Sequence, residues 1–146
     1  MKLMSSAFTE GGAIPDKYSC KGENVSPPFT IEGVPEKAQT LALIMDDPDA
    51  PVGTFDHWLV WNVPAATTEW PEHSLPVGVV QGNNGRGEAS YTGPCPPSGT
   101  HHYHFKLYAL DAPLDLKAGA GKAELEQAMQ GHTVDQTELI GTFAAK

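Results

Sequence analysis

A compact apolar run ends at two aspartates and a proline in residues 40–48, which read Thr-Leu-Ala-Leu-Ile-Met-Asp-Asp-Pro. The run before the aspartates is short for a helix and contains no charged position, which predicts a strand that is buried on both faces. Two aspartates and a proline then form a typical turn sequence. We therefore expect a central strand of a sheet, with carboxylates directly at its end.

Two more strands are predicted further along the chain. Residues 57–63 read His-Trp-Leu-Val-Trp-Asn-Val, and residues 103–110 read Tyr-His-Phe-Lys-Leu-Tyr-Ala-Leu. In the second stretch the period of two that is typical of strands places four apolar residues on one face: Tyr103, Phe105, Leu107 and Ala109. We expect these three strands to form the core of the sheet.

The rest of the chain predicts turns, edge strands and little helix. Thirteen prolines and fifteen glycines are spread along it, which favours many turns between short strands. A helix is predicted over about residues 122–130, ended by Gly131, because three apolar residues have helical spacing: Leu125, Ala128 and Met129. One or two further helical turns are predicted within residues 134–140. The fold class is mostly β, a sandwich or a closed sheet with short helices near the C-terminus.

Length and charge narrow the function classes. The chain has 146 residues, which favours a single domain over residues 1–146. Eighteen acidic residues against nine basic ones give a formal net charge of -9, so no long-range attraction to nucleic acid or to an anionic membrane surface is expected. A small anion can still bind where a pocket supplies its own positive potential.

The sequence predicts neither a membrane span nor a metal or cofactor. No run approaches the about 20 apolar residues of a span, and the N-terminal residues lack the apolar core of a signal peptide, which predicts a cytoplasmic protein. Cys20 and Cys95 are the only cysteines and form no C-x-x-C motif. In a reducing compartment we expect both to be free thiols, with one disulfide as the less favoured alternative.

Titratable residues gather at the ends of the predicted strands in two segments. The first spans residues 46–57 and contains four aspartates and His57, and the second, residues 93–103, reads Gly-Pro-Cys-Pro-Pro-Ser-Gly-Thr-His-His-Tyr. Taken singly, such turns are ordinary. Together they place carboxylates and imidazoles beside a rigid turn, whose free amides at Gly93 and Cys95 are expected to form a concavity for an anion.

These segments also resemble the signature motifs of the phosphatidylethanolamine-binding, or Raf kinase inhibitor-like, family in its bacterial and archaeal branch. The resemblance rests on Asp-Pro-Asp-Ala-Pro at residues 47–51, on His57-Trp58 and on residues 93–103, and it extends over nearly the whole chain. Two long motifs in the correct order are more specific than one short pattern. The resemblance implies a β-sandwich-like fold of two antiparallel sheets, with a pocket that accepts phosphate, acetate or a phosphoethanolamine head group.

The resemblance further implies seven ligand-binding residues, which match the acids, the two imidazoles, the turn and the tyrosine of the family's pocket: Asp47, Asp49, His57, Gly93, Cys95, His101 and Tyr103. His102 stands where the family usually has an arginine, which makes the expected charge weaker and more dependent on pH. A bare carboxylate repels an anion, so we expect Asp47 to orient an imidazole and raise its pKa. Phosphate affinity should then fall as the pH rises past about 6.5.

Three hypotheses of function follow. The first is a binding protein for a small anionic ligand, with a regulatory or inhibitor role toward a protein partner such as a kinase or protease, and with a homodimer mildly favoured by the resemblance. The second is a hydrolase, metal-assisted or metal-independent, that uses Asp47, His57 and His101. The H-E-x-x-H, G-x-S-x-G and Walker motifs are missing, so no enzyme and no catalytic residue are predicted. The third is a protease-inhibitor-type interaction protein that acts outside the pocket through a rigid proline-rich loop.

Overall fold

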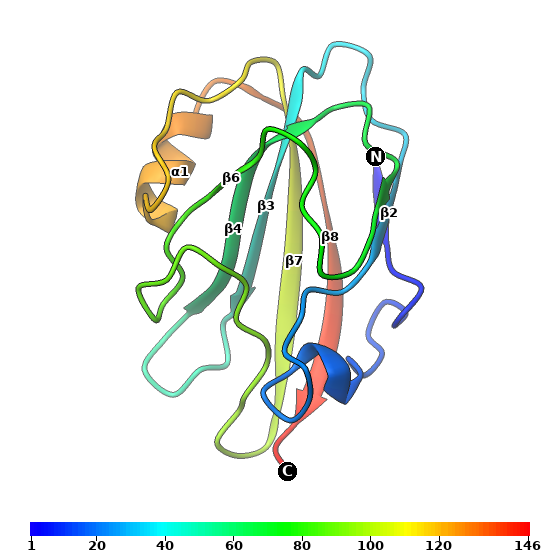
Figure 1. Ribbon diagram of the computed structural model, residues 1–146, viewed down its shortest axis with the longest axis vertical. Helices are drawn as coiled ribbons and strands as arrows, with labels where there is room; N and C mark the ends of the chain where they lie inside the picture. The colour runs from blue at the N-terminus through cyan, green and yellow to red at the C-terminus, as the bar shows by residue number, and fades with distance from the viewer.

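The computed structural model describes residues 1–146 without a gap and contains two antiparallel β-sheets that share one core (Figure 1). The large sheet has five strands in the order β6-β4-β3-β7-β8, and the small sheet has three in the order β1-β2-β5. The mostly β fold of two antiparallel sheets is therefore confirmed. The elements are β1 (Lys2–Met4), a 3-10 helix (Asp16–Tyr18), β2 (Phe29–Glu32), β3 (Thr40–Asp47), β4 (Phe55–Pro64), β5 (Glu69–Trp70), β6 (Val80–Gln81), β7 (Thr100–Leu110), α1 (Lys122–Met129) and β8 (Thr133–Ala144).

The three strands predicted from apolar runs are confirmed as neighbours in the large sheet. β3 lies at the centre, between β4 and β7, and all of its residues are buried. One face of β3 packs toward the small sheet, and the other packs under α1. This double coverage is the reason why the run in residues 40–45 contains no polar break.

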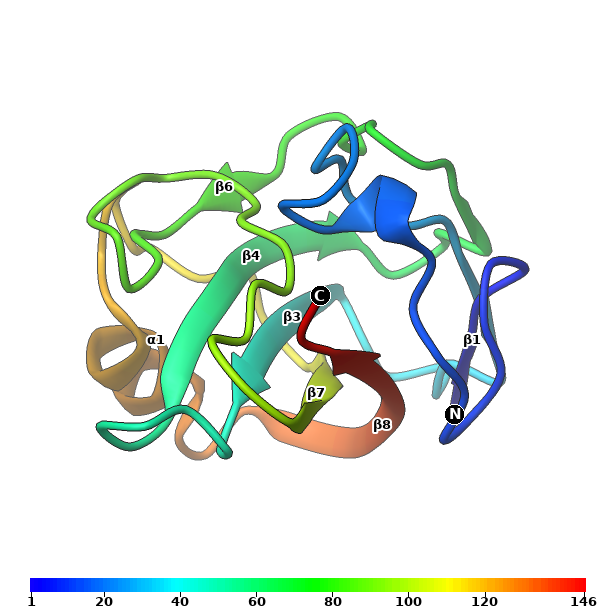
Figure 2. The ribbon, with the colours of Figure 1, turned by 90° about the horizontal axis from the view of Figure 1, so that it is seen from below.

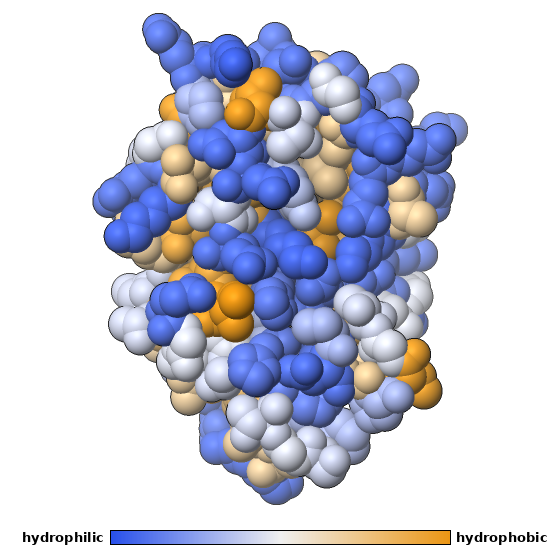
Figure 3. Space-filling model, turned by 180° about the vertical axis from the view of Figure 1, so that it is seen from behind, coloured by the Kyte–Doolittle hydropathy of each residue, from blue (hydrophilic) through white to orange (hydrophobic).

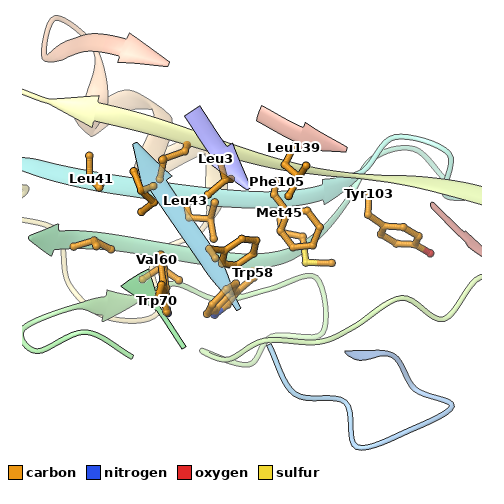
Figure 4. Close-up of a cluster of buried hydrophobic side chains, with 14 of the residues drawn as sticks. Leu3, Leu41, Leu43, Met45, Trp58, Val60, Trp70, Tyr103, Phe105 and Leu139 are labelled. Atoms are coloured by element: carbon orange, nitrogen blue, oxygen red, sulfur yellow. The ribbon is translucent and has the colours of Figure 1, made fainter. Parts of the chain in front are cut away.

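Alternate residues of the large sheet build the core between the two sheets. Leu41 and Met45 of β3 and Phe105 of β7 belong to this core and lie among the labelled side chains of Figure 4. Trp58 of β4 meets Trp70 of the small sheet with ring centroids 5.4 Å apart. Each fully buried side chain of this size contributes about 2 kcal/mol to stability. The packing therefore fixes which residues of each strand point inward.

The outer face of the large sheet is covered by α1 over only part of its area. Leu125 and Met129 of α1 pack in one cluster with Ile44 and Trp61 of the sheet, so the predicted helix is confirmed to within one residue. Gly131 follows its end with a φ of 79°, a value that favours glycine. Beyond α1, hydrophilic side chains cover the middle of the face seen in Figure 3. No helix of the protein has the length and apolar content of a membrane span.

The helical turns predicted within residues 134–140 are wrong, because this segment is part of β8. β8 pairs with β7 over the full length of both strands. Its buried positions alternate at Leu139, Gly141 and Phe143, as the period of a strand requires. Pairing with a strand that lies far away in the sequence decided this element, and the local pattern did not reveal it.

Candidate functional site

The two motif segments meet at one end of the large sheet. Figure 2 views this end from below, where the loop between β3 and β4 and the segment that leads into β7 approach the ends of these strands. Together they border a cavity of about 390 Å³. Six of the seven predicted residues line it: Asp47, His57, Gly93, Cys95, His101 and Tyr103.

Asp47, His101 and Tyr103 reach the cavity through the same alternation that builds the core. Asp47 continues the inward-facing row of β3, and the other two continue that of β7. Asp46 points to the opposite face, where its Oδ2 accepts a hydrogen bond from Nζ of Lys122 at 2.7 Å. The two adjacent aspartates therefore serve different faces, and only Asp47 belongs to the site.

A β-bulge turns His57 into the cavity. The pairing of β3 with β4 skips His57. Regular alternation from Trp58, which lies in the core between the sheets, would direct His57 to the outer face. Instead, its ring packs against Phe55 and Tyr103, with centroid distances of 4.8 and 5.2 Å. Bulges commonly redirect a side chain beside a functional site, and this one brings the second imidazole to the cavity.

Asp47 uses both of its carboxylate oxygens within the protein. Oδ1 accepts a hydrogen bond from the backbone N–H of Asp49 at 2.8 Å, and Oδ2 accepts one from Nδ1–H of His101 at 2.7 Å. Both Asp47 and His101 are buried. The carboxylate therefore orients the imidazole and leaves Nε2 of His101 as the ring atom that can meet a ligand.

His57 is held in one tautomer by the backbone of Thr92. Its Nδ1 lies 2.7 Å from the carbonyl oxygen of Thr92, and because a carbonyl oxygen only accepts, Nδ1 carries the hydrogen and donates. Burial lowers the pKa of His57 below its ordinary value of 6.5, although the bond to Thr92 and nearby carboxylates partly oppose this. At neutral pH His57 is therefore a neutral ring with a lone pair on Nε2.

The turn before β7 is more constrained than the sequence suggested. The backbone N–H of Gly93 donates to Oδ1 of Asn24 at 2.8 Å, so the expectation that this amide is free for an anion is wrong. A Cβ at position 93 would clash with the backbone oxygen of Tyr18, which explains the glycine. Burial raises the pKa of Tyr103, so Tyr103 keeps its hydroxyl hydrogen, although a hydrogen bond donated by the backbone N–H of Cys95 partly opposes the rise.

Cys20 and Cys95 form a disulfide, so the expectation of two free thiols is wrong. The residues are 75 positions apart, but their Cα atoms lie 5.5 Å from each other. The N–H of Cys20 also donates to the carbonyl oxygen of Pro94 at 3.1 Å. The tertiary structure alone creates this proximity, and the bond ties the N-terminal segment to the wall of the cavity.

Asp49 is the predicted residue that does not line the cavity. Its Oδ2 accepts hydrogen bonds from the backbone N–H and from Nδ1–H of His102, both at 2.8 Å. The side-chain bond to His102 is the main reason why the pKa of Asp49 is below its ordinary value of 3.8. Asp49 thus ties the β3–β4 loop to β7 and, through its own N–H, supports Asp47. Its role as a ligand-binding residue stays a prediction.

Arg86 lines the cavity and was missed from the sequence. The loop that carries it is organised by the buried Asn84, whose Oδ1 accepts hydrogen bonds from the N–H groups of Arg86 and Glu88 at 2.8 and 3.3 Å. The Arg86 side chain is 65% exposed and lies 3.7 Å from a carboxylate oxygen of Glu88. A signal existed, because Arg86 is the only arginine of an acidic chain, but nothing local connects it to the two motifs.

No group of three or more histidine, cysteine, aspartate or glutamate side chains is arranged to hold a metal ion. In the cavity, Nδ1 of His57, Nδ1 of His101 and both carboxylate oxygens of Asp47 already have protein partners. The cavity can offer a ligand two imidazole Nε2 atoms and the guanidinium of Arg86. Nothing in this arrangement adds support to the hydrolase hypothesis.

Sequence comparison finds relatives along almost the entire chain. A family model described as phosphatidylethanolamine-binding protein matches residues 4–144. A UPF0098 protein of Methanothermobacter thermautotrophicus is 49% identical over 148 residues, which cover 98% of each chain. A UPF0098 protein of Pyrococcus horikoshii is 47% identical over 152 residues, which cover 98% of this chain and 76% of the relative.

Solved structures have the same architecture. A homologue of the phosphatidylethanolamine-binding protein from Chlamydia trachomatis matches with a TM-score of 0.95 and 41% identity, over 99% of this chain and 97% of the other. Escherichia coli YbcL, described as a new member of the mammalian family of these proteins, matches with a TM-score of 0.92 and 31% identity, over 99% and 98% of the two chains. The similarity therefore includes both sheets and the segments around the cavity.

Proposed function

Because this chain belongs to the phosphatidylethanolamine-binding protein family, we propose that it binds a small anionic ligand in the cavity at the end of the large sheet. The ligands proposed are phosphate, acetate and phosphoethanolamine-like head groups. The observation that carries the proposal is the position of Arg86, the only arginine of a chain with a net charge of -9, on the cavity that the two motif segments border.

The cavity explains how an acidic protein can hold an anion. Long-range repulsion from surface carboxylates is screened within about 10 Å at ordinary salt, so contacts inside the cavity decide the affinity. Phe55, Pro96 and Pro97 form part of its wall and carry no charge, which reduces the solvent around a bound group and strengthens each hydrogen bond to it. The volume of about 390 Å³ lies within the range of small-molecule sites and has room for a phosphoryl head group.

The test is calorimetric titration of the purified protein with inorganic phosphate. Saturable binding is expected, and the variant Arg86→Gln should bind about five- to tenfold more weakly, because a largely exposed cation contributes about 1 kcal/mol. Lys37→Gln is the matched control, since Lys37 is exposed and precedes β3 at the end of the strand opposite Asp47. An absence of saturable binding by the unmodified protein would refute the proposal.

A regulatory or inhibitor role toward a protein partner is the second part of the proposal. Val52 lies in the β3–β4 loop with 98% of its surface exposed, beside Pro51, which lines the cavity. An apolar, proline-stiffened rim loses little entropy when a protein docks on it. Docking at the rim and docking outside the pocket can be distinguished by a capture experiment. It compares how much partner is bound by the unmodified protein and by Val52→Asp, each with and without saturating phosphate.

The identity of that partner, a kinase or a protease, stays a prediction. The homodimer and the cytoplasmic location stay predictions as well. Sedimentation of the purified protein at several concentrations tests the first of these two, because a reversible dimer dissociates on dilution.

A further inference from the structure

We infer that the cavity selects a phosphoryl group that still carries a proton, with a P–O–H of the ligand donating to Nε2 of His57. The inference rests on the proposed function and narrows its ligand from any small anion to inorganic phosphate or a protonated phosphomonoester. Sulfate and phosphodiesters, which have no such hydrogen, are disfavoured. Three observations at the cavity lead to this specificity.

The first observation is the fixed tautomer of His57. Its Nδ1–H donates to the carbonyl oxygen of Thr92 at 2.7 Å, and that oxygen cannot donate in return. The hydrogen of the neutral ring is therefore committed to the backbone. Nε2 is left with a lone pair and can only accept a hydrogen bond.

The second observation is that this lone pair can be reached from the cavity. Every buried side-chain nitrogen and oxygen of the protein has a hydrogen-bond partner, whereas the only hydrogen bond of the His57 ring is made by Nδ1. Nε2 is therefore not enclosed by protein. Since His57 lines the cavity and its ring packs against Phe55 and Tyr103, Nε2 is the atom that a ligand meets.

The third observation concerns charge. Asp47 lines the same cavity as a buried carboxylate whose oxygens are both occupied by donors, and burial keeps His57 from becoming a cation by lowering its pKa. A fully deprotonated oxygen at Nε2 of His57 would face a lone pair, in a cavity that already contains a carboxylate. A hydrogen on the ligand turns the contact with His57 from repulsion into a hydrogen bond, while another ligand oxygen remains for Arg86.

The experiment compares inorganic phosphate with sulfate by calorimetric titration at about pH 8, where phosphate is chiefly a dianion with one remaining hydrogen and sulfate is a dianion with none. Their charge and shape are closely matched. Phosphate is expected to bind at least about tenfold more tightly, because the buried acceptor is left unpaired by sulfate. Equal affinities would overturn the inference and leave the proposed function intact. If neither anion binds, the proposed function fails and the inference falls with it.

The variant His57→Gln tests the residue assignment. A carboxamide can rotate to present either a donor or an acceptor, so the preference for phosphate over sulfate should shrink to about threefold or less. His132→Gln is the matched control, because His132 is an exposed histidine that pairs with Asp111 beyond the opposite end of β7. If His57→Gln discriminates as strongly as the unmodified protein, the acceptor is another atom and the inference is wrong.

Two further measurements complete the test. Nitrogen NMR of the histidine rings reports the tautomer without any substitution, and Nε2 of His57 should be unprotonated before phosphate is added and shift upon binding. A lipid source of the phosphoryl group is tested with vesicles of phosphatidylethanolamine, whose phosphates are diesters. Vesicles are expected not to displace phosphate, and displacement would contradict the selection for P–O–H.

Discussion

At the scale of single residues, the site is defined by which ring atoms the protein already uses. Nδ1 of His101 is held by Asp47, and Nδ1 of His57 is held by Thr92. The first partner is an anion and the second is a neutral carbonyl, so the two imidazoles have different surroundings although both lie at strand ends. Both histidines were predicted from the sequence, and Asp47 was expected to orient one of them without its being clear which. The partner of His57 could not be predicted, because Thr92 is 35 residues away from it.

The lowered pKa of His57 predicts how stability depends on pH. The unfolded chain binds a proton at His57 near pH 6.5, whereas burial delays protonation in the folded protein. Below pH 6.5 the unfolded state therefore holds more protons, and the contribution of neutral His57 to stability is lost as the pH falls toward the lowered folded pKa. The loss should be absent from His57→Gln, which carries no titratable ring.

Urea unfolding of the unmodified protein and of His57→Gln at several pH values checks this prediction. The difference between their free energies of unfolding should be constant above about pH 7 and should shift in favour of the variant as the pH falls to about 5. A difference that does not change over this range would show that His57 titrates normally in the folded protein.

At the scale of elements, a bulge in one strand helps to place the site, and a covering segment protects the edge of another strand. The bulge in β4 redirects His57, and the outer edge of β8 is covered by residues 11–14. In that segment the N–H of Gly11 donates to the carbonyl oxygen of Ile140, and the N–H of Ile14 donates to that of Thr142, both at 2.7 Å. An edge strand that is covered in this way cannot pair with another molecule there.

Gly141 is predicted to be required for this covering. A Cβ at Gly141 would lie 2.6 Å from a side-chain carbon of Ile14 and 2.8 Å from the ring of Phe8. Gly141→Ala should therefore lower the free energy of unfolding by about 1–3 kcal/mol through overpacking. Chemical unfolding checks it, with Gly121→Ala as the control because its added Cβ would meet only a Glu124 oxygen at 3.7 Å. Equal stabilities of the two variants would show that the segment yields without cost.

At the scale of the whole molecule, the N-terminal third supports the cavity from outside the large sheet. Tyr91 donates its hydroxyl hydrogen to the carbonyl oxygen of Tyr18 at 2.6 Å, Gly93 is bound by Asn24, and the disulfide joins Cys20 to Cys95. Residues 18–24 thus hold residues 91–95, of which Thr92, Gly93 and Cys95 line the cavity. The disulfide does not fit the reducing compartment assumed in the prediction of free thiols, because such bonds persist chiefly in oxidising compartments or in proteins of hyperthermophiles.

The disulfide is predicted to stabilise the whole protein. It closes a loop of 75 residues, so the double variant Cys20→Ser/Cys95→Ser should lose about 2–5 kcal/mol of unfolding free energy. Thermal unfolding under non-reducing conditions measures the loss. In a second arm, the unmodified protein is unfolded in the presence of a reducing agent. Its melting temperature should then approach that of the double variant. Unchanged melting in both arms would mean that the wall is held by its hydrogen bonds alone.

The amino-acid sequence was sufficient to predict the three central strands, α1 and the two motif segments, because each depends on a local period or a turn sequence of a few consecutive residues. It also pointed to six residues that line the cavity. Long-range packing determines the disulfide, the strand at residues 133–144, the position of Arg86 and the partners of His57 and Gly93. These features join residues that are far apart along the chain, and such contacts exist only after the two sheets have packed.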